Sequence, residues 1–242
     1  MIAVGSLLLL LILSIVFYRQ FFKRFYDIVL SGLALIVLSP LLIILMITGA
    51  IAMGGNPFFT QKRPGKKDKN GKERIFKLIK FRTMSNKKDA SGNLLPDDQR
   101  LNKYGKFLRS TSLDELPELL NIFIGDMSVI GPRPQLVKDM VFMSEEQRHR
   151  HDVRPGLSGL AQVNGRNNIT WEQKFEYDLE YISKISLLGD IGLILKTIFK
   201  VFKRADTVRE GTESDIDFGD WLLKEGKIDQ TEYKRKIEMA NF

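Results

Sequence analysis

Two apolar segments near the start of the chain constrain its fold more than any other feature. Residues 2–17 and 28–53 contain no charged side chain, whereas the rest of the sequence is strongly polar. A run of about 20 apolar residues crosses the hydrocarbon layer of a bilayer, so residues 28–53 are long enough and residues 2–17 are slightly short. The sequence therefore predicts a membrane-associated protein with one modest catalytic domain after its apolar start.

Basic residues flank the second apolar segment on both sides, at positions 19–24 and 62–67. By the positive-inside tendency both flanks belong on the cytoplasmic side, which a straight crossing helix does not satisfy. Pro40 removes a backbone donor and clashes with the preceding turn, so we expect the helix to bend at Ser39-Pro40 and return to the face it entered. The Ser39 hydroxyl is a ready partner for backbone groups freed there. A straight span that tolerates the proline is the alternative.

We divide the chain into four parts. These are an N-terminal hydrophobic segment (1–18), a re-entrant membrane helix (19–55), a cytoplasmic domain (56–210) and a polar tail (211–242), in which residues 221–241 are predicted to be helical. The first part is a short span or an interfacial anchor. A cleaved signal peptide is less well supported, because the basic residues follow the apolar run and no small-residue cleavage site stands out.

The residue inventory limits the chemistry. The chain has no cysteine and two histidines, so thiol catalysis, disulfides and a histidine-rich or thiolate metal centre are not expected. Catalysis must rest on carboxylates, hydroxyls, lysines and arginines. A net charge of +8 favours an anionic partner, and anionic lipid, phosphorylated substrates and nucleic acid all fit that charge.

The segment 109–121 carries the most chemical information. Ser112 and Glu115 match a capping box, and Pro117 cannot lie far inside a helix, so a helix should begin close to Asp114. The free amides and dipole at such a helix start favour an anion. Adjacent carboxylates beside an arginine could also hold a divalent cation and a diphosphate together. The alternative is that Asp114 and Glu115 only cap the helix.

Two later loops have the composition of ligand sites. Pro132 and Pro134 fix the backbone around Arg133, which reduces what must be ordered when the guanidinium binds an anion. In residues 154–166 glycines allow close approach of the backbone to a ligand. The polar candidates in this second loop are Gln162, Asn164 and Arg166. Simple surface turns are the alternative.

Periodicity indicates a mainly helical α/β domain around these motifs. Residues 75–82 alternate as a strand, with Lys77 opposed to its apolar neighbours, and residues 97–108 predict a short helix. Residues 171–185 predict a helix with Asp178 on its polar side, where a lone carboxylate is usually solvated. A basic amphipathic helix follows, suited to the membrane interface or to core packing. Its apolar stripe is Leu188, Ile191, Leu195, Ile198, Phe199 and Phe202, opposite Lys196, Lys200, Lys203 and Arg204.

Taken in order, these motifs closely resemble the bacterial sugar transferase family of small monotopic phosphoglycosyl transferases, over about residues 19–210. The matching motifs are Asp27 after the basic start, Ser39-Pro40, Gln61 to Gly65, Lys80 to Met84, Ser112 to Pro117, Gly131 to Pro134 and Pro155 to Arg166. The resemblance implies a membrane-associated monotopic fold with a re-entrant helix broken at Ser39-Pro40. It also implies a compact cytoplasmic α/β domain with interfacial amphipathic helices.

The resemblance further implies the reaction. Asp114 would attack the β-phosphate of a UDP-sugar, release UMP and carry the phosphosugar until a polyprenyl (undecaprenyl) phosphate takes it. Such an attack needs cations that offset repulsion between two anions. Mg²⁺ would be required, with Asp114, Glu115 and Asp178 as ligands, and Glu115 would bind metal or manage protons. Substrate contacts would come from Lys80, Arg82, Arg109, Arg133, Gln162, Asn164 and Arg166.

The expected partners are therefore a UDP-sugar, polyprenyl phosphate and membrane lipid, at the cytoplasmic face of a bacterial inner membrane, with homodimer formation left open. Nucleic acid is not expected, because the basic loops lack an aromatic platform for bases. A membrane-tethered binding protein without chemistry is one rival, but it leaves the carboxylate pair among arginines unexplained. A phosphohydrolase, in which water intercepts the aspartyl phosphate, is the nearer rival.

Overall fold

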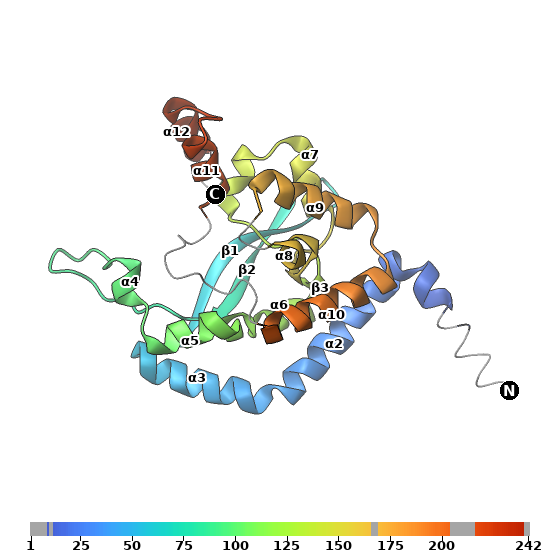
Figure 1. The fold of residues 1–242 in the computed structure, drawn as a ribbon, viewed down its shortest axis with the longest axis horizontal. Coiled ribbons are helices and arrows are strands. Elements are labelled where there is room, and N and C mark those ends of the chain that lie inside the picture. Colours follow the sequence, from blue (N-terminus) through green and yellow to red (C-terminus); the bar gives the residue numbers. More distant parts are fainter. Residues whose placement is uncertain (1–8, 10–11, 166–168, 204–215, 240–242) are drawn as a thin grey trace.

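The computed structural model describes residue 9 and residues 12–165, 169–203 and 216–239. A bent pair of helices, α2 (Lys23–Val37) and α3 (Ser39–Met53), runs along one side of the molecule (Figure 1). A π-helical turn, η1 (Tyr18–Phe22), leads into it. The residues before position 9, like positions 10 and 11, lie outside the described part, so the predicted N-terminal segment is described only near its end.

The predicted bend falls at Leu38, directly before Ser39-Pro40. Pro40 lies in the first turn of α3, where its missing N–H costs no intrahelical bond. The Ser39 hydroxyl donates to the carbonyl of Ile36 at 2.7 Å, which confirms the expected role of this side chain. Among the described residues no single helix is both long and apolar enough to cross a membrane. The helices over 18–37 and 39–53 meet that requirement only as a pair, bent by 64°.

A hairpin of two antiparallel strands, β1 (Phe58–Lys67) and β2 (Glu73–Phe81), forms the centre of the domain. The predicted strand over 75–82 is confirmed, with Lys77 exposed between the buried Phe76 and Leu78. That buried face packs on α6 (Glu118–Ile124) through Leu119 and Ile122. Since residues two apart on a strand share a face, Lys80 also points toward α6. A second, parallel pair joins β3 (Ser128–Ile130) to β4 (Gly156–Ser158).

The helix predicted over 97–108 is two helices, α4 (Asp97–Arg100) and α5 (Lys103–Thr111). Leu101 breaks the helix because it pairs with Met84 in an isolated β-bridge. The Asn102 side chain then caps α5 by accepting from the Gly105 amide at 2.8 Å. A Cβ at Gly105 would lie 1.9 Å from the carbonyl oxygen of Thr83, so only glycine permits α5 to pack this closely on the end of β2.

Helix α10 (Leu187–Lys203) follows α9 (Trp171–Ser183) and lies beside α2 in Figure 1. Its predicted apolar stripe faces outward over residues 188–199, with Leu188, Leu195 and Phe199 exposed by 73%, 62% and 58%. The core-packing alternative is therefore wrong for these residues. Arg204, which was predicted to extend the basic face, lies outside the described residues.

The segment after residue 216 is not an extended tail. It forms α11 (Phe218–Lys224) and α12 (Gln230–Met239) in place of the one helix predicted over 221–241. The Phe218 ring lies 5.2 Å from that of Trp171, measured between centroids, and Lys138 of η3 (Val137–Phe142) forms an ion pair with Asp217 at 2.7 Å. Figure 1 shows α11 and α12 on the side of the domain away from α2 and α3.

A buried carboxylate fixes the bent helix pair to the domain. Asp27 of α2 is 4% exposed, and its Oδ1 accepts from the Ser128 hydroxyl at 3.0 Å and the Val129 amide at 2.9 Å. Nearby, the Arg24 guanidinium donates to the carbonyls of Ile122 and Phe123 at 2.6 and 2.8 Å. The start of α2 is thus hydrogen-bonded to β3 and to the end of α6.

We expect Asp27→Ala to lower the free energy of unfolding by about 2 kcal/mol, because it leaves the Val129 amide without its acceptor and removes one of the two acceptors of the buried Ser128 hydroxyl, which keeps only the Ile130 carbonyl. Denaturation of the detergent-solubilised protein measures the change. Asp98→Ala removes an exposed carboxylate and serves as the matched control, with an expected change within about 0.5 kcal/mol. Equal effects of the two substitutions would contradict the anchoring role of Asp27.

Candidate active site

The predicted catalytic carboxylates lie on a short 3-10 turn, η2 (Leu113–Glu115), between α5 and α6. Ser112 precedes it in the left-handed conformation, with φ 55°, and its side chain makes no capping bond. The predicted capping box is therefore wrong, and α6 begins only at Glu118. The reason is that Glu115 turns toward distant cations instead of back to Ser112. Asp114 lies within this 3-10 turn, so a helical turn does begin close to Asp114 as predicted, but the α-helix begins four residues after it.

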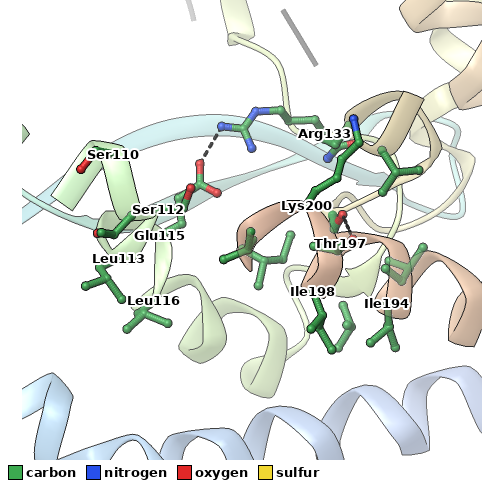
Figure 2. Close-up of a pocket in the computed structure, with 18 residues that line it drawn as sticks. Ser110, Ser112, Leu113, Glu115, Leu116, Arg133, Ile194, Thr197, Ile198 and Lys200 are labelled. Atoms are coloured by element: carbon green, nitrogen blue, oxygen red, sulfur yellow. Dashed lines mark hydrogen bonds and ion pairs between the residues drawn. The ribbon is translucent and has the colours of Figure 1, made fainter. Parts of the chain in front are cut away.

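Glu115 is held between two cations. Its Oε1 lies 2.8 Å from Lys80 Nζ and 2.7 Å from an Arg133 guanidinium nitrogen, and Figure 2 shows Arg133 reaching toward it. Burial opposes ionisation, but Arg133 and Lys80 outweigh it and hold the pKa of Glu115 well below its usual range. The charge of Glu115 in turn raises the pKa of Arg133. Both groups are therefore charged at neutral pH, which leaves Glu115 suited to binding cations and not to donating a proton.

Asp114 has a different environment. Within the described part of the chain no hydrogen bond or ion pair engages its carboxylate. Burial and the charge of Glu115 raise the pKa of Asp114, while Lys80, Arg133 and Arg109 act in the opposite direction. Arg109 is oriented by a hydrogen bond from its Nε to the Thr83 hydroxyl at 3.1 Å. The Asp114 carboxylate, which has no hydrogen-bond or ion-pair partner among the described residues, thus lies in the electrostatic field of three cations.

Glu118 is a site residue that sequence reasoning missed. It is 2% exposed, and its Oε1 lies 3.2 Å from Lys80 Nζ without good hydrogen-bond geometry. Burial, and then the charge of Glu115, raise the pKa of Glu118 to about 7. The sequence did contain a signal for Glu118, namely its distance of three residues from Glu115. Residues three apart in a helical turn lie on the same side, so Glu118 could have been placed beside Glu115.

Behind Arg133 lies a buried ion pair. The Arg150 guanidinium donates to Asp178 Oδ2 at 2.6 and 3.0 Å and to the Arg133 carbonyl at 2.7 Å. The Arg150 and Asp178 side chains are 1% and 4% exposed, so the expectation that Asp178 is solvated is wrong. Arg150 was also missed, because it lies in a basic run that a local pattern assigns to the surface. Asp178 is therefore linked to the site through Arg150 and Arg133.

The remaining predicted residues are not all brought together. Arg82 is half-buried, and its backbone amide donates to Pro57 at 2.7 Å. Asn164 is exposed at the end of α8 (Leu160–Asn164), and Arg166 lies outside the described residues. Gln162 does face the site region, where both polar atoms of its side chain are buried without a hydrogen-bond partner.

A cavity of about 440 Å³ adjoins the carboxylates, between η2 and α10 (Figure 2). Its polar lining includes Glu115, Arg133, Gln162 and Lys200, whereas Asp114 lies outside the lining. The apolar lining is Leu113, Leu116, Val129, Ile130, Leu157, Val163, Ile194, Ile198 and Val201. The cavity is thus mostly apolar and has charged groups from the carboxylate site in its wall.

The residues present fit a magnesium ion only in part. No group of three or more His, Cys, Asp or Glu residues suited to a metal ion occurs in the described ranges. Mg²⁺ is commonly held by one or two carboxylates together with phosphate oxygens of a substrate, and Asp114 and Glu115 match that requirement. An unpaired carboxylate, a second acidic group and three cations define a site suited to chemistry on a phosphate group.

Comparison with known proteins agrees with this class of site. The sequence model of the bacterial sugar transferase family matches residues 18–204, and the chain therefore belongs to that family, as the ordered motifs predicted. The sugar transferase EpsL of Bacillus subtilis is 42% identical over 179 residues, covering 74% of this chain and 86% of EpsL. The exopolysaccharide production protein ExoY of Sinorhizobium fredii is 36% identical, covering 73% and 83% of the two chains.

A longer relative carries a more specific name. The UDP-glucose:undecaprenyl-phosphate glucose-1-phosphate transferase of Klebsiella pneumoniae is 41% identical over 191 residues, covering 75% of this chain. The match spans only 40% of that relative's length, so the similarity concerns one part of the larger protein.

We expect the stability of the wild type to fall as pH rises from 5 to 8, relative to Glu118→Gln. The folded protein retains a proton on Glu118 up to a pKa of about 7, whereas an unfolded glutamate loses it near its ordinary pKa of about 4.3. The folded state therefore binds more protons in this window, and stability decreases with pH, by on the order of 2 kcal/mol. Denaturation at several pH values measures it. Parallel profiles for the two proteins would contradict the raised pKa.

Proposed function

We propose that the protein is a phosphoglycosyl transferase that moves a phosphosugar from a UDP-sugar to polyprenyl (undecaprenyl) phosphate and releases UMP. The observation that carries the proposal is the uncommitted Asp114 carboxylate within the field of Lys80, Arg109 and Arg133. The names of the Klebsiella pneumoniae relative and of a 37% identical Escherichia coli relative, both UDP-glucose:undecaprenyl-phosphate glucose-1-phosphate transferases, support the substrate classes. The reaction would begin the membrane stage of polysaccharide or glycoconjugate synthesis.

In the first step an Asp114 carboxylate oxygen attacks the β-phosphorus of the UDP-sugar. The bond between that phosphorus and the oxygen bridging to the α-phosphate breaks, and UMP leaves with the bonding electrons. Lys80, Arg109 and Arg133 offset repulsion between the carboxylate and the diphosphate, and they stabilise charge on the leaving phosphate. The phosphosugar is then an acyl phosphate on Asp114.

In the second step a phosphate oxygen of the polyprenyl phosphate attacks the same phosphorus. The bond to the Asp114 oxygen breaks, which restores the carboxylate and yields the polyprenyl diphosphosugar. A covalent intermediate divides one difficult transfer between two anions into two displacements at one phosphorus. It also retains the phosphosugar while UMP is exchanged for the lipid.

Asp114 and Glu115 would hold Mg²⁺ together with substrate phosphate oxygens, and the ion would neutralise charge on the transferred phosphate. Asp178 was predicted as a third ligand. Its Oδ2 accepts two hydrogen bonds from Arg150, which favours a role in positioning Arg133 over direct contact with the ion.

The bent pair α2–α3 would lie in one leaflet of the bacterial inner membrane and return to the cytoplasmic face. Support comes from the 64° bend and from exposed apolar side chains such as Ile36, Val37 and Ile51, at 72%, 72% and 77%. Helix α10, whose apolar stripe is exposed, lies beside α2 (Figure 1), which supports a position of α10 at the membrane interface. Catalytic groups would then face the cytoplasm, where nucleotide sugars are made available.

UMP release from a panel of UDP-sugars, with magnesium and undecaprenyl phosphate, tests the reaction. We expect turnover by the wild type and a loss of at least ~10³-fold for Asp114→Asn, because an amide cannot serve as the nucleophile. Asp98→Asn makes the same chemical change at an exposed position and should retain full activity. Full turnover by Asp114→Asn would rule out the covalent route.

The reaction products distinguish the transferase from the two rival functions. A sugar-containing lipid identifies a transferase, whereas free sugar phosphate at the same rate would identify a phosphohydrolase. Absence of UMP with every donor would favour the binding-protein alternative.

Membrane topology has a separate test, because the chain has no native cysteine. Arg19→Cys and Lys66→Cys place single thiols at exposed positions on the two flanks of the bent pair. We expect a membrane-impermeant maleimide to label neither in intact cells and both after permeabilisation, since a re-entrant helix keeps both flanks on the cytoplasmic side. Labelling of one position but not the other in intact cells would indicate a straight span.

A further inference from the structure

We infer that the cavity between η2 and α10 receives the phosphate end of the acceptor lipid, with the first isoprene units against its apolar wall and the phosphate beside Arg133 and Lys200. The inference rests on the proposed function and adds to it the place where the second substrate binds. It identifies the occupant by three features: the wall, the charges and the way in.

The wall suits a branched hydrocarbon and not a nucleotide sugar. Nine apolar side chains line the cavity, contributed by η2, the residue after it, β3, β4, α8 and α10. A volume of about 440 Å³ is typical of a small-molecule site and too small for a whole polyprenyl chain. Five hydroxyl side chains also line the cavity, but all except that of Ser112 are hydrogen-bonded within the described part of the protein; they are Ser110, Thr111, Ser112, Ser158 and Thr197. A hydroxyl-rich sugar or a uracil ring would therefore find few free partners in this wall. The cavity therefore fits only the first units of the polyprenyl chain, and the remainder of the lipid would stay in the bilayer.

The charges select an anionic head group and orient it. Arg133 and Lys200 line the cavity, and Figure 2 shows them toward the same end, with Ile194 and Ile198 nearer the bent helix pair. Arg133 also contacts Glu115 at 2.7 Å, the residue next to Asp114. A lipid phosphate drawn to Arg133 thus arrives beside the proposed nucleophile, where the second displacement takes place.

The proposed entrance for the lipid lies along α10. Ile198 lines the cavity and is also 47% exposed, beside Leu195 and Phe199, which are 62% and 58% exposed on the outward stripe. The apolar wall and the proposed membrane-facing stripe therefore meet at Ile198. An isoprenoid chain can pass from the bilayer into the cavity along this helix without exposing its hydrocarbon to water.

Filling the cavity tests the inference. In mixed micelles, Ile194→Trp should raise the KM for undecaprenyl phosphate by at least ~10-fold, because the indole occupies the space of the first isoprene units. Geranyl phosphate, which carries only those first units, should be affected equally. The donor half-reaction, measured without lipid as exchange of labelled UMP into the UDP-sugar, should stay within about 2-fold of the wild type. Leu94→Trp introduces the same indole at an exposed position outside α10 and outside the cavity lining; it is the matched control and should keep both half-reactions.

The outcomes are distinct. Equal loss of UMP exchange and of lipid transfer in the folded Ile194→Trp protein would assign the cavity to the donor, and unchanged kinetics for both substrates would leave it without a role. Either result overturns the inference. Ile198→Trp, at a half-exposed position that tolerates bulk, repeats the test if Ile194→Trp does not fold. Absence of UMP exchange in the wild type would instead contradict the proposed function itself.

Discussion

The ion pairs of Glu115 with Lys80 and Arg133 are the interaction on which the rest of the site depends. They join β2, η2 and the loop after β3, three segments far apart in the chain, through contacts of 2.8 and 2.7 Å. A carboxylate buried without cations would be costly or protonated. With both cations present Glu115 is ionised. The three positive charges of Lys80, Arg109 and Arg133 still exceed the two negative charges that Asp114 and Glu115 can carry. Glu118 has a pKa of about 7, so its ionisation around neutral pH adds one negative charge to the site.

A second buried cluster sets the site relative to the bent helix pair. Lys23 Nζ, at the start of α2, donates to Asp190 Oδ2 of α10 at 2.6 Å and to the Ile130 carbonyl at 2.9 Å. Tyr181 of α9 donates to the same Asp190 carboxylate at 2.9 Å. The end of β3, which leads into the Arg133 loop, is therefore tied to both α2 and α10. Helix α10 forms one wall of the cavity. These hydrogen bonds therefore fix the position of the cavity relative to α2 and α3, the proposed membrane helices.

Local sequence determines some of this arrangement and long-range pairs determine the rest. The bend at Ser39-Pro40, the strand containing Lys77 and the apolar stripe of α10 were predictable, since each follows from a few consecutive residues, but whether that stripe faces outward or into the core was left open. The capping box failed because Glu115 finds partners 35 and 18 residues away. The burial of Asp178 depends on Arg150, 28 residues distant, and a single sequence contains no local signal for that pair. The site motifs were recognisable, but which of their side chains meet was not.

Charge also explains why a covalent route suits this site. The diphosphate of a nucleotide sugar and the phosphate of a lipid acceptor together carry more negative charge than Lys80, Arg109 and Arg133 can offset at once. Simultaneous binding would therefore be opposed by repulsion in a half-buried site of low dielectric. If Asp114 retains the phosphosugar after UMP leaves, the same cations serve each substrate in turn. The cavity beside Arg133, with its apolar wall and its opening along α10, then needs to admit only the lipid, and the donor needs no place in it.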